Sequence, residues 1–139
     1  MAGYMLQPTG RGRRPGGEPL DTAAIEAAQA MLAALPFPAL WIGPRHVVLW
    51  RNAAATDTYG DARLPCYRLI HGHEAPCDRH GEPCTLRAGA AGREGPAVPH
   101  LHEGIQGQGF YKVVALRVRG GGALELHWPL DEVLVSDVL

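Results

Sequence analysis

The stretch GFYKVVALRVRGGGALELHW, residues 109–128, predicts a β-hairpin. Its two arms, 109–118 and 123–128, are rich in β-branched and aromatic side chains, which favour strands. Three consecutive glycines at 120–122 separate the arms as a turn. The C-terminal part of the chain is therefore expected to contribute two neighbouring antiparallel strands.

Extended structure is also expected upstream of this hairpin. Residues 39–42 and 46–50 predict two strands around a Gly43-Pro44-Arg45 turn. Residues 97–102 predict a further strand, which a glycine-rich turn at 103–108 joins to the C-terminal hairpin. The sequence thus indicates five strands.

Three helices are predicted between and before these strands. The first begins at Asp21, whose carboxylate can cap the first turn, and ends at Pro36. Its apolar positions form one stripe, able to face the core or a second copy of the helix, and consist of Ile25, Ala28, Leu32 and Leu35. Shorter helices are expected at 52–59, with Asn52 as its cap and Gly60 at its end, and at 84–91, closed by Gly92.

Together these elements predict an α+β domain. It has a five-stranded antiparallel sheet with short helices on one face, preceded by an N-terminal helix that leads into the domain. The expected organisation is a flexible Gly/Pro/Arg tail at 1–19, a leading or dimerisation helix at 20–36, the domain at 37–130 with a Cys/His insert at 64–86, and a C-terminal tail at 131–139.

Several segments, taken in order, resemble a PAS domain from about residue 30 to residue 129. They are ALPFPALWI, HVVLW, RNAAATDTYG, GFYKVVALRV and ALELHW. The sharpest part is LPCYRLIHGHEAPCDRHGEPCTL, residues 64–86, which is similar to the insert of a subset of bacterial sensor PAS domains. The resemblance implies sensing and homodimerisation in signal transduction, with a histidine kinase or transcription factor as possible partner, and it implies no reaction.

Three cysteines lie in this insert, and each follows a proline. They are Cys66, Cys77 and Cys84. An odd number of cysteines argues against a disulfide framework and favours metal or redox chemistry. Three thiolates and one imidazole could form a tetrahedral site of the kind that Zn²⁺ prefers, so the sequence predicts a structural or sensing zinc site.

Three histidines of the insert compete for the fourth ligand position. His71 ranks first, because it stands where the similar inserts carry their histidine. His80 is the runner-up, since it lies midway between Cys77 and Cys84 with Gly81 available for a turn. His73 ranks third.

Other interpretations of the insert remain open at this point. The cysteines could pack as small apolar residues. They could instead form a thiol redox sensor, with a low-pKa thiolate near Arg68, Arg79 or Arg87. Iron, haem or no cofactor at all are further alternatives, the last describing a metal-free interaction and dimerisation adaptor.

Three histidines on the C-terminal strands are expected to be exposed. His100 and His102 alternate on one predicted strand and His127 lies on a nearby one, so the three could also line a pocket or ligate a metal. Exposed strand histidines are the preferred interpretation.

Enzymatic, nucleic-acid and membrane functions are not predicted. Ser136 is the only serine, which excludes Ser-His-Asp catalysis. Thirteen basic against fourteen acidic residues give a net charge of -1, which disfavours nucleic acid or an anionic membrane as the main partner. The sequence contains no apolar stretch typical of a signal peptide or a bilayer span, so a cytoplasmic location is expected.

Overall fold

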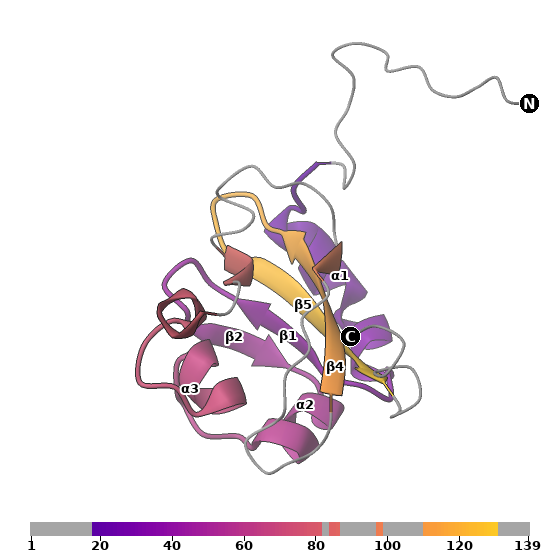
Figure 1. Cartoon of the computed structure of the whole chain (residues 1–139). Coiled ribbons are helices and arrows are strands. Elements are labelled where there is room, and N and C mark those ends of the chain that lie inside the picture. The colour runs from indigo at the N-terminus through magenta and orange to yellow at the C-terminus, as the bar shows by residue number, and fades with distance from the viewer. Residues whose placement is uncertain (1–17, 82–83, 87–96, 99–109, 131–139) are drawn as a thin grey trace, which may run out of the picture.

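A computed structural model of the 139-residue chain describes residues 18–81, 84–86, 97–98 and 110–130. Within these residues, an antiparallel sheet contains four strands of four to eight residues, namely β1 (Ala39–Ile42), β2 (Val48–Arg51), β4 (Phe110–Arg117) and β5 (Ala123–Leu130). The two-residue β3 (Ala97–Val98) pairs with the outer edge of β4. The resulting order, β2-β1-β5-β4-β3, places β5 at the centre of the sheet (Figure 1).

The prediction of a five-stranded sheet is wrong for one strand. A strand was expected over residues 97–102, but among the described residues only Ala97–Val98 are extended there. Residues 99–102 and the expected turn at 103–108 lie outside the described residues. Within the described residues the sheet therefore has four full strands, with the two-residue β3 as a short pairing at one edge.

Both predicted hairpins are confirmed. β4 pairs with β5 from Phe110 opposite Leu130 to Arg117 opposite Ala123. All three turn glycines, 120–122, have positive φ angles, which glycine adopts without steric cost. In the other hairpin, β1 pairs with β2, and the backbone N–H of Gly43 donates to the Val47 carbonyl at 2.7 Å.

The helices agree with the sequence in position but not in every boundary. α1 (Thr22–Ala33) ends before the predicted Pro36. Asp21 precedes α1 without making a side-chain cap, and pairs instead with Arg119 at 3.0 Å. α2 (Ala53–Tyr59) is capped as predicted, since the Asn52 side chain accepts from the Ala55 N–H. Of the helix expected at 84–91, residues 85–86 are helical and the remainder lies outside the described residues.

Two further short helices follow α2. The short helices α2 and α3 lie on one face of the sheet, as predicted, and the N-terminal helix α1 covers the other face. α3 (Cys66–His71) and α2 pack with the β1 side chains Leu40 and Ile42. α1 packs through Ile25 with Leu124 and with Trp41, which points to the opposite face of β1. The predicted apolar stripe of α1 is thus used in packing on its own chain, on the side away from α2 and α3 (Figure 1).

Candidate functional site

All three cysteines line one cavity between the sheet and the segment that holds α3 and η2 (Cys77–His80). The cavity volume is about 30 Å³, which is room for an ion or one to two water molecules. Pockets for organic ligands are roughly ten times larger, so this cavity is too small for haem. Its wall comprises His46, Cys66, Tyr67, Ile70, His71, Cys77, Cys84, Thr85, Val113, Glu125 and His127.

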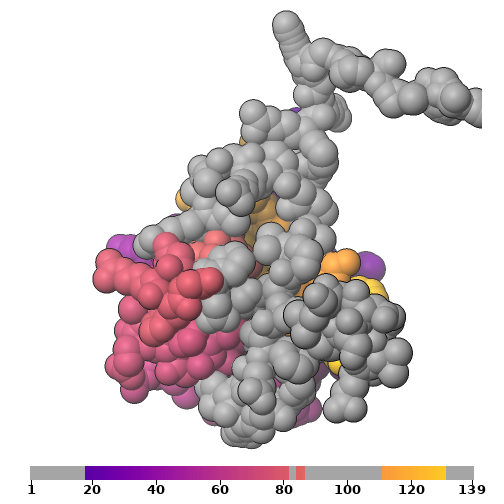
Figure 2. All heavy atoms as spheres, viewed as in Figure 1, coloured from indigo at the N-terminus to yellow at the C-terminus, as the bar shows by residue number. Residues whose placement is uncertain are grey.

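Proline residues set the start of the helices that present two of the thiols. Pro65 and Pro76 occupy the positions just before α3 and η2, with φ angles of -59° and -52°. Cys66 and Cys77 are therefore the first residues of their helices. The fixed φ of proline restricts the backbone at each point, as the sequence pattern suggested. α3 and η2 form one continuous surface on the left of the molecule in Figure 2.

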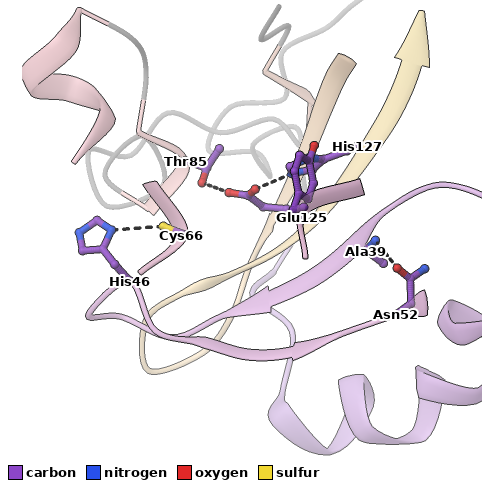
Figure 3. A network of polar contacts seen from close by, with 8 residues as sticks. Ala39, His46, Asn52, Cys66, Thr85, Glu125 and His127 are labelled. Carbon is purple, nitrogen blue, oxygen red and sulfur yellow. Dashed lines mark hydrogen bonds and ion pairs between the residues drawn. The ribbon is translucent and has the colours of Figure 1, made fainter. Parts of the chain in front are cut away.

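Cys66 is held against the β1–β2 turn. Its backbone N–H donates to the His46 carbonyl at 2.9 Å, and its Sγ lies 3.5 Å from His46 Nδ1 (Figure 3). Burial raises the pKa of the Cys66 thiol, and Glu125, Cys77 and Cys84 raise it further. Cys66 is consequently a neutral thiol at neutral pH, which is unlike the low-pKa thiolate of a redox sensor.

A buried polar network forms the sheet side of the cavity. Glu125 and His127 lie two residues apart on β5 and point to the same face. His127 Nε2 is 2.8 Å from Glu125 Oε1, and its Nδ1 is 2.6 Å from the Tyr59 hydroxyl. Thr85 donates to Glu125 Oε2 (Figure 3). The network therefore links α2, the centre of the sheet and the residue after Cys84.

The partners of this network fix some of its hydrogen bonds. Burial, with smaller contributions from Tyr111 and Glu125, raises the pKa of Tyr59, so Tyr59 keeps its proton. A carboxylate oxygen accepts, so His127 Nε2–H donates to Glu125 Oε1. The other ring nitrogen, Nδ1, makes its hydrogen bond with the Tyr59 hydroxyl.

One of the three insert histidines lines the cavity and the other two do not. His71, the predicted fourth ligand, lines the cavity with the three cysteines. His73 and the runner-up His80 do not line this cavity. The three rings instead form a stacked column, with centroids of His71 and His73 separated by 5.2 Å and those of His73 and His80 by 4.0 Å.

Sequence reasoning missed the residues of the sheet wall. His127 was expected to be exposed, but it is 1% exposed, and Glu125 and Tyr59 were not candidates at all. A usable signal was the ALELHW pattern, in which polar and leucine side chains alternate on a strand that is buried on both faces. His100 and His102 lie outside the described residues.

No set of three or more His, Cys, Asp or Glu side chains within the described ranges is arranged so that it could hold a metal ion. The predicted ligands therefore share a cavity without converging on one point. A metal would have to draw them together.

Comparison with known proteins adds no further constraint on this site. Neither the protein-family models nor the curated proteins gave a match to this chain. In the described part of the chain, every helix is too short or too polar to cross a lipid bilayer.

Proposed function

We propose that this protein is a sensory or regulatory module whose input is a metal ion, with Zn²⁺ preferred, bound by Cys66, Cys77 and Cys84. The observation that carries the proposal is that three cysteines from separate turns of the insert line a single ion-sized cavity. Thiolates are the soft ligands that Zn²⁺ takes in tetrahedral sites. A fourth ligand comes from the cavity wall, where His71 and Glu125 both lie.

The same geometry supports a role in sensing. Because no three of the described ligand-type side chains converge on one point, binding requires the segment carrying α3 and η2 to close on the ion. Thiol protons are released as the thiolates bind. That closure is the conformational output, transmitted through the Pro65–Cys66 contacts to the β1–β2 turn. The sequence resemblance to sensor PAS domains supports the same role, with a kinase or transcription factor as the partner that reads it.

The proposal is tested by elemental analysis of the untagged full chain purified without chelator, followed by Zn²⁺ titration of the metal-free protein. We expect about one Zn²⁺ per chain and a change in near-ultraviolet circular dichroism on binding. Cys66→Ser, Cys77→Ser and Cys84→Ser should each weaken binding. Arg79→Ala, an exposed substitution within η2, is the matched control and should bind as the wild type does.

Two outcomes would overturn the proposal. A folded protein that contains no metal and takes up no Zn²⁺ from solution would remove the metal input. Binding that survives all three serine substitutions would place the metal elsewhere. A coloured sample that contains iron would show that the bound ion is iron and not zinc.

A further inference from the structure

Glu125 is a carboxylate inside the molecule, facing the cysteines across the cavity. Glu125 is 6% exposed and lies on β5, the central strand of the sheet. Thr85, which donates to it, directly follows Cys84 in the chain. The carboxylate and the thiols thus line one cavity although they come from distant segments.

Two hydrogen bonds orient this carboxylate. His127 donates to one oxygen and Thr85 to the other, while Tyr59 holds the His127 ring from its far side. A carboxylate has about four acceptor sites, and carboxylates that bind metals in proteins are ordinarily also hydrogen-bonded by surrounding groups. Glu125 therefore has the support that is typical of a ligating carboxylate.

The cavity wall supplies two kinds of ligand that a zinc ion takes. Glu125 and the three cysteines all line the cavity. Zn²⁺ binds both thiolate sulfur and carboxylate oxygen.

His71 is less firmly oriented toward the cavity. It is the last residue of the six-residue α3, and its ring stacks in the column formed with His73 and His80. Glu125 instead extends from a strand that is paired on both sides, with β1 and with β4. Ligands on rigid elements are positioned more accurately than ligands at the ends of short ones.

We infer that Glu125 supplies a carboxylate oxygen as the fourth ligand of the metal ion, in the position that the sequence assigns to His71. This inference rests on the proposed function, because it requires the three cysteines to bind the ion. An ion bound by Glu125 and the cysteines would join the insert directly to the centre of the sheet. Closure of the insert would then act on β5.

X-ray absorption spectroscopy of the Zn²⁺-loaded wild-type chain tests the inference without any substitution. We expect about three sulfur neighbours near 2.3 Å and one oxygen near 2.0–2.2 Å, without the outer-shell scattering of an imidazole. A clear imidazole signal would overturn the inference and restore a histidine ligand. Absence of bound Zn²⁺ would instead overturn the proposed function itself, so the two failures are distinct.

Co²⁺ titration of variants provides the second test. Glu125→Gln should keep the thiolate-to-cobalt charge-transfer band, shift the ligand-field bands and lower the affinity by about 100-fold, the upper range for losing a supporting residue. His71→Ala and the control His73→Ala should change the affinity by less than about 3-fold, below the range for a supporting residue. A strong loss in His71→Ala together with wild-type binding by Glu125→Gln would refute the inference.

Circular dichroism of each metal-free variant establishes that it is folded. If Glu125→Gln does not fold, Glu125→Asp keeps the charge and withdraws the carboxylate by one methylene. Weaker Co²⁺ binding by Glu125→Asp then supports the inference, and unchanged binding contradicts it.

Discussion

Asn52 shows how one buried side chain can hold several segments together. Its Oδ1 accepts from the backbone N–H groups of Ala39 at 3.0 Å and Ala55 at 2.9 Å. Its Nδ2 donates to the carbonyls of Leu32 at 2.9 Å and Phe37 at 3.1 Å. The residue is 3% exposed, so water cannot readily replace these partners. The end of α1, the start of β1 and the start of α2 therefore depend on this amide.

Replacing Asn52 with alanine should lower the free energy of unfolding by about 3 kcal/mol, because buried backbone groups lose their partners and α2 loses its cap. Denaturant unfolding followed by circular dichroism measures the change. Asp57→Ala, an exposed position on α2, should change stability by no more than about 0.5 kcal/mol. An Asn52→Ala loss below about 1 kcal/mol would contradict this role.

The Cys66 thiol should make the metal-free protein less stable in mild alkali. In the unfolded chain a thiol ionises near about pH 8.5, whereas burial raises the pKa of Cys66 in the folded protein. Above about pH 8.5 the unfolded state releases a proton that the folded state retains. Unfolding therefore becomes more favourable as the pH rises.

The measurement is the free energy of unfolding between about pH 8 and 9.5, below the range where tyrosine ionises in unfolded chains. We expect a decline with pH that is shallower in Cys66→Ala. Comparing slopes separates the titration from the loss of packing that this substitution also causes. Equal slopes in the two proteins would show that the thiol ionises as readily when folded.

The β4–β5 turn is an element whose tip rests on the neighbouring hairpin. A Cβ on Gly122 would overlap the Ile42 carbonyl oxygen and lie 3.1 Å from Gly43 atoms. A Cβ on Gly120 would meet nothing within 4 Å, although its φ of +91° is equal to that of Gly122. The two glycines thus share the conformational requirement and differ in the space around them.

Gly122→Ala should therefore destabilise the protein by about 3 kcal/mol or more, since backbone strain and steric overlap act together. Gly120→Ala should cost only about 1–2 kcal/mol for its positive φ. Thermal and denaturant unfolding of the two variants provide the comparison. Equal losses would mean that close approach to β1 contributes nothing.

For the whole molecule, Zn²⁺ bound in the cavity that the three cysteines line should raise the free energy of unfolding. Zn²⁺ at about 100 times its dissociation constant should add about 2.7 kcal/mol to the free energy of unfolding. For a chain of this size, that corresponds to a rise in Tm of roughly 10 °C. The rise should disappear on adding a chelator, and differential scanning calorimetry measures it.

A variant with all three cysteines changed to serine is the control for this effect. Its Tm should not respond to Zn²⁺. A similar rise in this variant would show that the ion acts through other groups, and no rise in either protein would argue against binding to the folded state.

Much of the local structure could be predicted because neighbouring residues determine it. The glycines at 120–122 with the strands around them, and the Asn52 cap of α2, involve contacts over a few positions along the chain. The resemblance to similar inserts singled out His71, which lines the cavity together with the cysteines. The predicted ends of the helices were less accurate, since α1 ends at Ala33 and not at Pro36.

The buried wall of the cavity could not be derived in this way. Tyr59 and His127 are 68 positions apart, and Thr85 and Glu125 are 40 apart, so their contacts depend on how the sheet brings distant segments together. Alternation along β5 indicates that Glu125 and His127 share a face, but not that α2 and α3 cover it. The pattern of residues thus determined the hairpins, the Asn52 cap and the cysteine-bearing insert, whereas packing across the sheet decided that those thiols face a buried carboxylate.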